Sequence, residues 1–162
     1  MRRIIFFLLL AAGLRLFGLL PFESHDVATL QPIRALVVSL DGGEIVLDGG
    51  VCQGRGKTVD KALSDLFESG DGTVFLRTAS HVVLSGKAQS LLYDLVESRA
   101  LRPAAVVVAS AGTPPDPETA ANYLDAHSRG VTVGEVGAAI VRKEPVHLPL
   151  LAETKGGLRL YG

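Results

Sequence analysis

The fold of this chain is decided by residues 51–110, which read VCQGRGKTVDKALSDLFESGDGTVFLRTASHVVLSGKAQSLLYDLVESRALRPAAVVVAS. Short apolar runs in this segment alternate with stretches whose apolar residues recur every three or four positions. The short runs indicate buried strands, and the three-to-four spacing indicates helices that pack one face on a core. The expected order is strand, helix, strand, helix, strand, which predicts crossover connections within one sheet.

The first helix of the segment follows a glycine-rich turn, Gly54-Arg55-Gly56-Lys57-Thr58. This turn is similar to a phosphate-binding loop, but that loop requires a glycine at position 51, where the chain has Val51. A shift of one residue re-aims the backbone N–H groups that hold phosphate, so no nucleotide binding is predicted. Thr58 is instead expected to cap a helix that ends at Gly70. The residues expected on its buried face are Val59, Ala62, Leu63, Leu66 and Phe67.

Further strands are expected on both sides of this segment. The apolar runs 33–40 and 44–47 are joined by Asp41-Gly42-Gly43, which predicts a β-hairpin. The run 104–110 is continuously apolar and is typical of a central strand covered on both faces. Residues 146–152 and 158–161 predict a last pair of extended segments. The expected fold class is therefore α/β (α+β), a mixed β-sheet with a βαβαβ core and flanking helices, preceded by an N-terminal hydrophobic helix.

Three more helices are predicted after the first. One has its apolar positions at Ala88, Leu91, Leu92, Leu95 and Val96. The next begins at Asp116-Pro117 and runs to about His127. Its apolar face, Ala120, Ala121 and Leu124, is so thin that a surface helix is expected. The last begins with a capping box, Thr132 to Glu135, and ends before Pro145.

The N-terminus is predicted to be a membrane address. Met1-Arg2-Arg3 precedes an apolar stretch, residues 4–20, that is interrupted by Arg15. Seventeen residues are at the short end of what spans a bilayer, and an arginine near one end of the stretch reaches the interface. We expect residues 1–22 to be a signal or anchor segment and residues 23–162 a single domain on the extracytoplasmic face. The alternative is a cleaved signal, with cleavage after Gly13.

Composition excludes several classes of function. Three of the 16 basic residues lie in the N-terminal segment, so residues 23–162 carry 13 basic and 17 acidic side chains, a net charge of −4. That balance argues against nucleic acid as a partner. The chain has no tryptophan and a single cysteine, Cys52, which excludes an internal disulfide framework and a CxxC site.

No spacing of chemically active residues predicts a catalytic, cofactor or metal site. His25, His81, His127 and His147 are at least twenty residues apart in sequence, so no single element brings metal ligands together. His81 is expected to be hydrogen-bonded locally at a strand edge. Ser110 lacks the first glycine of a nucleophile elbow and is expected to be an ordinary serine at a strand end.

Several motifs resemble the spore germination C-subunit family (Ger(x)C type). Gly54 to Thr58 resembles that family's Gly-x-Gly-Lys-Thr segment, and Ala62 stands where the family has alanine. Residues 80–86, SHVVLSG, are similar to its Gly-His strand. Residues 147–151 and 157–162 resemble the segment that closes the family's first domain. In this family the C-subunit accompanies two integral membrane subunits at the spore inner membrane and is needed for the response to nutrients.

The resemblance covers residues 26–162 and implies an extracytoplasmic assembly module without enzymatic activity. The chain departs from the family in one respect, because family members carry a lipid-modified cysteine after the apolar segment and this chain has none before Cys52. The family also continues past the glycine matching Gly162 into further domains. A second hypothesis is a small membrane-anchored, hydrolase-like enzyme whose site is assembled only in three dimensions.

If the chain is an assembly module, its contact surface is expected on the elements least needed for the core. These are the loop 112–117, the helix after it with Asn122 and His127, and the final strands near Tyr161. The final strands are expected to leave a sheet edge open, and an open edge favours pairing with another chain.

Overall fold

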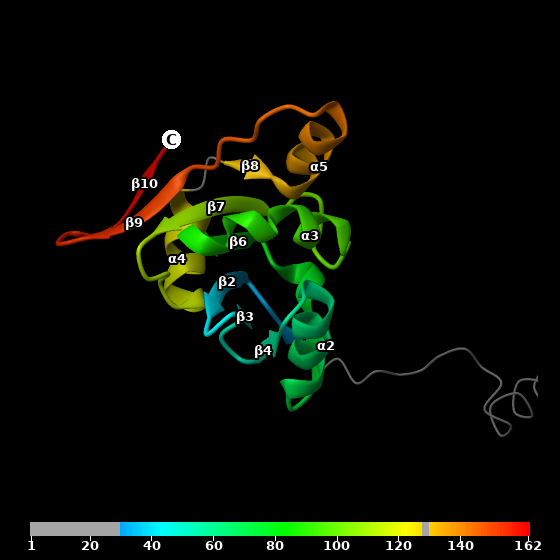
Figure 1. The fold of residues 1–162 in the computed structure, drawn as a ribbon. Coiled ribbons are helices and arrows are strands. Elements are labelled where there is room, and N and C mark those ends of the chain that lie inside the picture. Colours follow the sequence, from blue (N-terminus) through cyan, green and yellow to red (C-terminus); the bar gives the residue numbers. More distant parts are fainter. Residues whose placement is uncertain (1–29, 128–129) are drawn as a thin grey trace, which may run out of the picture.

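The computed structural model describes residues 30–127 and 130–162 as a mixed α/β fold. The predicted N-terminal segment 1–22 and His25 lie outside these residues. No helix in the described ranges is long and apolar enough to cross a membrane. The helices of this part are α2 (Val59–Ser69), α3 (Leu92–Glu97), α4 (Pro117–His127) and α5 (Val133–Arg142), with the 3₁₀ helices η2 (Leu76–Thr78) and η3 (Gly86–Leu91) (Figure 1).

The helices pack on a mixed sheet, as predicted. The sheet has eight strands, seven of them in the order β10-β9-β7-β6-β2-β3-β4, and β8 pairs with β7. Strands β2, β6, β7 and β9 are parallel neighbours, and the remaining pairs are antiparallel. Two short strands, β1 (Leu30–Pro32) and β5 (Thr73–Phe75), form a separate parallel pair. The strands of the large sheet are β2 (Ala35–Asp41), β3 (Glu44–Asp48), β4 (Gln53–Gly56), β6 (His81–Ser85), β7 (Val106–Ala111), β8 (Val131–Thr132), β9 (Leu150–Thr154) and β10 (Gly157–Tyr161).

Several predicted elements are confirmed with their local causes. β2 and β3 form the expected hairpin, and Gly42 and Gly43 supply the positive φ angles that its two-residue turn requires. Thr58 caps α2 by accepting a hydrogen bond from the backbone N–H of Lys61. Thr132 and Glu135 form the predicted capping box of α5. These features depend on residues close in sequence, which is why the sequence reveals them.

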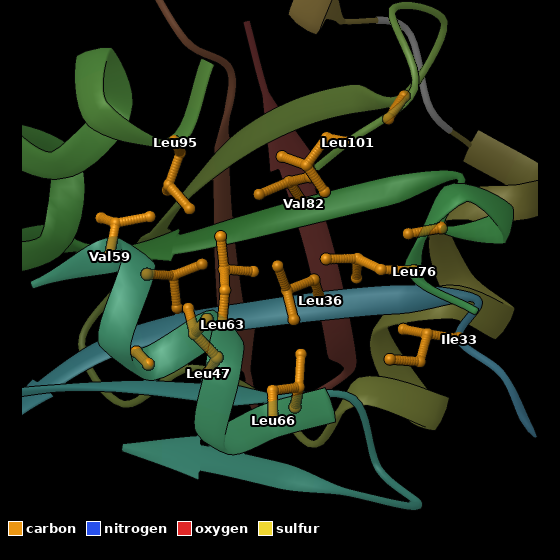
Figure 2. Packing of buried hydrophobic residues seen from close by; sticks show 14 of the residues in the cluster. Ile33, Leu36, Leu47, Val59, Leu63, Leu66, Leu76, Val82, Leu95 and Leu101 are labelled. Atoms are coloured by element: carbon orange, nitrogen blue, oxygen red, sulfur yellow. The ribbon is translucent and has the colours of Figure 1, made fainter. Parts of the chain in front are cut away.

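Each face of the sheet covers its own hydrophobic core. The first core lies between the sheet and α2, η3, α3 and α5, and it includes Leu36, Leu47, Leu66 and Val82 (Figure 2). The second core lies on the opposite face, beneath α4. β7 contributes to both, with Val107 in the first core and Val108 in the second. The prediction that this strand is covered on both faces is therefore confirmed.

The glycine turn predicted at 54–58 is wrong for its first half. Gly54 and Gly56 lie in strand β4, paired with β3, and not in a turn. Both face α2, which approaches so closely that an added Cβ at Gly54 would lie 2.2 Å from the carbonyl oxygen of Ala62 and 2.4 Å from the backbone nitrogen of Leu66. The glycines are therefore explained by close packing of a helix backbone on a strand backbone.

Two predicted helices differ in their packing. In α2, Phe67 was expected on the buried face but is 45% exposed. The second predicted helix is divided into η3 and α3, although Ala88 and Leu95 are buried as expected.

The prediction that α4 is a surface helix is wrong. Ala120, Ala121 and Leu124 are completely buried and pack on the sheet in the second core. Alanine has little apolar area, so the sequence pattern is weak, yet its small size lets the helix lie close to the strands. The helix begins as predicted, because Oδ1 of Asp116 accepts hydrogen bonds from the backbone N–H groups of Glu118 and Thr119.

Candidate functional site

The side chains considered as catalytic candidates do not converge. His81 begins β6, whereas Ser110 lies near the carboxyl end of the neighbouring β7, opposite Ser85. His81 lies four residues before Ser85 on β6, so it is about 13 Å from the position of Ser110 at the usual rise per strand residue. Cys52 is buried just before β4, and burial raises the pKa of its thiol, which disfavours the nucleophilic thiolate. Within the described residues, no group of three His, Cys, Asp or Glu side chains is placed to hold a metal ion.

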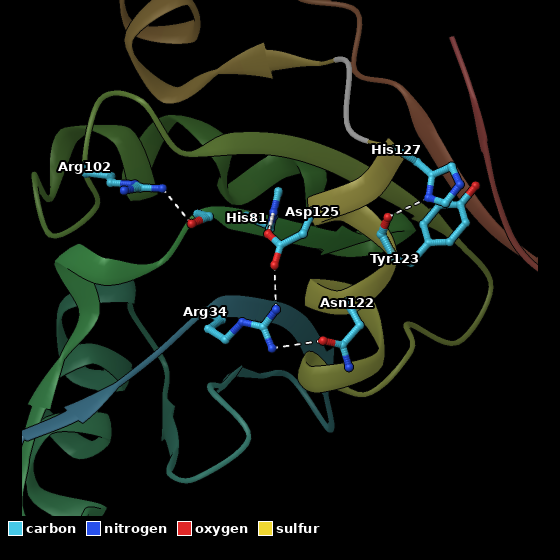
Figure 3. A network of polar contacts seen from close by, with 8 residues as sticks. Arg34, His81, Arg102, Asn122, Tyr123, Asp125 and His127 are labelled. Atoms are coloured by element: carbon cyan, nitrogen blue, oxygen red, sulfur yellow. Dashed lines mark hydrogen bonds and ion pairs between the residues drawn. The ribbon is translucent and has the colours of Figure 1, made fainter.

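His81 belongs to a polar network that the sequence did not reveal. The imidazole Nε2 donates a hydrogen bond of 2.8 Å to Oδ1 of Asp125 on α4 (Figure 3). The expectation of a local partner at a strand edge is wrong on both counts, because β6 lies between β2 and β7 and the partner is 44 residues away. The physical reason is that α4 packs across the amino ends of these strands and brings the Asp125 carboxylate to Nε2 of His81.

Arg34 completes the network from the residue before β2. Its guanidinium forms an ion pair with the other oxygen of Asp125 and donates a 2.9 Å hydrogen bond to Oδ1 of Asn122. Both carboxylate oxygens of Asp125 therefore have partners, Oδ1 with His81 and Oδ2 with Arg34. Hydrogen bonds from His81 and, next in effect, from Arg34 hold the pKa of the Asp125 carboxyl below its usual value.

This arrangement joins α4 to the amino ends of β2 and β6. Only 5% of the His81 side chain is exposed, so the ring is buried between the sheet and α4. The hydroxyl of Ser80, the residue before His81, accepts a hydrogen bond of 2.6 Å from Nη2 of Arg102. The network fixes the amino ends of β2 and β6 to the helix that covers the second core.

Replacing Asp125 with asparagine is expected to destabilise the domain by about 1 kcal/mol at pH 7, since half-exposed ion pairs contribute modestly. The folded-state pKa of Asp125 is lowered, so its contribution is present above the unfolded pKa of about 3.9 and is lost as pH falls through the folded value. The difference in unfolding free energy between the variant and the unaltered chain should therefore shrink below about pH 4. Urea titrations across this range measure it, with the exposed Asp71→Asn as control; a difference independent of pH contradicts the account.

The predicted contact elements lie on one side of the molecule. β10 is the end strand of the sheet, which agrees with the expected open edge. The hairpin of β9 and β10 stands at the margin of the fold (Figure 1). Tyr123 of α4 supports this hairpin, because its hydroxyl accepts a hydrogen bond of 3.2 Å from the backbone N–H of Leu160.

Asn122 and His127, which were expected to contact a partner, form interactions within the domain itself. Asn122 accepts from Arg34, as described above. His127 stacks on Tyr123 with ring centroids 4.4 Å apart, and its Nδ1 lies 2.9 Å from the carbonyl oxygen of Tyr123. Substituting either residue would disturb α4 itself, so the exposed residues of the hairpin are better probes of binding.

The exposed side of the hairpin carries an apolar pair. Leu150 and Tyr161 stand opposite each other on β9 and β10 and are 39% and 50% exposed. A hollow of about 440 Å³ lies beside Leu150, with Leu92, Val146 and Leu148 in its wall. We call Leu150, Tyr161 and the outer edge of β10 the hairpin surface.

Comparison of the chain with protein-family models, curated proteins and solved structures finds no match.

Proposed function

We propose that this chain is a non-enzymatic, membrane-tethered module that binds other membrane proteins on the extracytoplasmic face, like the first domain of the germination C-subunits that its motifs resemble. The observation that carries this proposal is the hairpin surface, where an open strand edge and an exposed apolar pair adjoin. Natural sheets protect their edges with proline, lysine or very short strands. β10 has five residues, contains neither proline nor lysine, and has one charged side chain, Arg159.

The hairpin surface suits an extended segment of another chain. A strand added beside β10 gains backbone hydrogen bonds along the edge, and its side chains meet those of β10 on both faces. On one face it would meet Tyr161, and on the other it would meet Leu158 and Leu160, which pack against the second core. Tyr123 keeps β10 in place by accepting a hydrogen bond from the backbone N–H of Leu160, so an added strand would pair with the remaining backbone groups of this edge.

The tether in this proposal is the apolar segment 4–20. We expect the protein to fractionate with membranes and to remain there after a high-salt wash, because its anchor is hydrophobic and insensitive to screening. Protease added from outside the cytoplasmic membrane should cut the domain. Recovery of a soluble protein that begins at Leu14 would show that the segment is a cleaved signal.

Chemical crosslinking in native membranes is expected to capture a multi-pass membrane protein. Tyr161→Lys should reduce that capture at least fivefold, because it places a charge on the hairpin surface. Val141→Lys is the matched control, since Val141 is an apolar residue on α5 that is 83% exposed. Both variants should unfold at the same urea concentration as the unaltered chain.

The competing hypothesis, a membrane-anchored hydrolase, predicts a different outcome. Hydrolysis of a generic ester, peptide or glycan by the purified protein, abolished by substitution of His81 or Ser110, would overturn the proposed function. An equal loss of capture with Tyr161→Lys and Val141→Lys would contradict the assignment to the hairpin surface.

A further inference from the structure

The segments that follow the neighbouring parallel strands β6 and β7 pack on opposite faces of the sheet. After β6 it enters η3 and α3, whose Ala88 and Leu95 pack in the first core. After β7 it enters α4, whose Ala120 and Leu124 pack in the second core on the other face. Where the connections of adjacent parallel strands leave on opposite faces, a crevice forms outside the carboxyl ends of the strands, and open α/β sheets bind ligands at such points.

A hollow of about 550 Å³ occupies this place in the fold. Its walls come from the ends of three strands: Ser39 of β2, Ser85 with Lys87 after β6, and Gly112 with Thr113 after β7. Gly112 has a φ of 84°, a left-handed conformation that lets the chain turn sharply beside the hollow. The volume lies within the range of small-molecule pockets, about 300–1,000 Å³.

The hollow contains polar groups that the fold does not use. Ser85 is 8% exposed, and its side chain does not cap the helix that follows it. Ser39 follows the paired residues Val38 and Leu84 and so stands level with Ser85, which places two hydroxyls side by side. Ser39 and Ser85 both line the hollow, so their hydroxyls are available to hydrogen-bond a ligand or water there.

The charge of the hollow has one sign. Lys87 is the charged residue among those that line it, and Lys87 forms no ion pair with the described residues. Asp41, at the end of β2, is already paired with Arg55 at 3.3 Å. Leu40 and Pro114 supply apolar wall beside these polar groups.

We propose that this crevice binds a small organic anion, in which a carboxylate or phosphate group is held by Lys87 and the hydroxyls of Ser39, Ser85 and Thr113. A lysine ammonium and serine hydroxyls donate hydrogen bonds to anionic oxygens, and such charge-assisted bonds are stronger than neutral ones. The apolar wall accommodates the carbon skeleton of the ligand. The site lies at the carboxyl end of the sheet and is independent of the hairpin surface.

The test is a titration of the isotope-labelled full chain in detergent micelles, followed by the amide resonances of Gly86, Lys87, Gly112 and Thr113. Sodium propionate and sodium phosphate are the probes, propionamide is the neutral analogue of propionate, and sodium chloride controls for ionic strength. Lys87→Gln removes the charge of the site, and Lys155→Gln removes an exposed charge from the turn between β9 and β10.

Saturable shifts at these four amides are expected with at least one anion and not with propionamide. Lys87→Gln should weaken the dissociation constant about tenfold, the loss expected when one charge-assisted hydrogen bond is removed. Lys155→Gln should leave it unchanged, and Ser85→Ala should weaken it severalfold. Shifts with phosphate alone assign a phosphate-bearing ligand, and shifts with propionate alone assign a carboxylate. Absence of saturable shifts with both anions, or equal weakening by the two lysine substitutions, overturns the proposal.

Discussion

Replacing Gly54 with alanine is expected to destabilise the domain by about 3 kcal/mol or more, a large part of the stability of a domain of this size. The new Cβ would lie 2.2 Å from the carbonyl oxygen of Ala62 and 2.7 Å from Cα of Leu66. These are backbone atoms of α2, so no side-chain rotation relieves the overlap. The helix has to move away from β4, and that movement opens the first core around Leu63 and Leu66.

Gly156→Ala is the matched control for this substitution. Gly156 lies in the turn between β9 and β10, and an added Cβ there meets nothing within 4 Å. Its free energy of unfolding should stay within about 0.5 kcal/mol of the unaltered chain. Urea denaturation of both variants measures the difference. A loss below about 1 kcal/mol for Gly54→Ala would contradict the close packing of α2 on β4.

Replacing Leu124 with alanine is expected to cost about 3 kcal/mol, within the range for fully buried leucines. Leu124 has no exposed area and lies in the second core with Val37, Val83 and Val108. α4 is the helix that covers this core, so little nearby structure is available to fill the cavity. The substitution tests directly whether α4 is a core helix or the surface helix that its pattern predicts.

Val141→Ala on α5 is the comparison for Leu124→Ala, because it also removes methyl groups from a helix but at a position that is 83% exposed. Its effect should stay within about 0.5 kcal/mol. Thermal and urea unfolding of the two variants give the comparison. Equal effects would show that α4 does not cover a core.

Features that depend on neighbouring residues could be predicted from the sequence. The β2–β3 hairpin follows from Asp41-Gly42-Gly43, and the caps at Thr58, Asp116 and Thr132 follow from one side chain close to a helix start. The strand 104–110 is correct to within two residues, because a continuous apolar run is characteristic of a strand covered on both faces.

Features that depend on distance between backbones could not be predicted. Gly54 and Gly56 look like turn residues in sequence, and only the approach of α2 explains them. The sequence identifies the apolar face of α4, but the small area of Ala120 and Ala121 does not reveal that this face lies close to the sheet and covers a core. The periodicity of apolar residues indicates which face of a helix is apolar. It does not indicate how closely that helix approaches a neighbouring strand.

The polar network of His81, Asp125 and Arg34 could not be predicted either, because its members are far apart in the sequence. His81 and Asp125 are 44 residues apart, and Arg34 and Asp125 are 91 apart. The crevice at the ends of β6 and β7 depends on the faces that η3, α3 and α4 cover, which sequence periodicity does not give. In contrast, the open edge at β10 was expected from the resemblance, because larger members of the germination C-subunit family continue their chain at this point.

The measurement that tests the proposed function most directly is site-specific photo-crosslinking in native membranes, with the reactive residue placed at Tyr161 or at Val141. Both positions are exposed and apolar, but only Tyr161 belongs to the hairpin surface. The account predicts that position 161 crosslinks to an extracytoplasmic segment of a multi-pass membrane protein and that position 141 does not. Equal crosslinking from both positions, or no membrane-protein adduct from position 161, would contradict it.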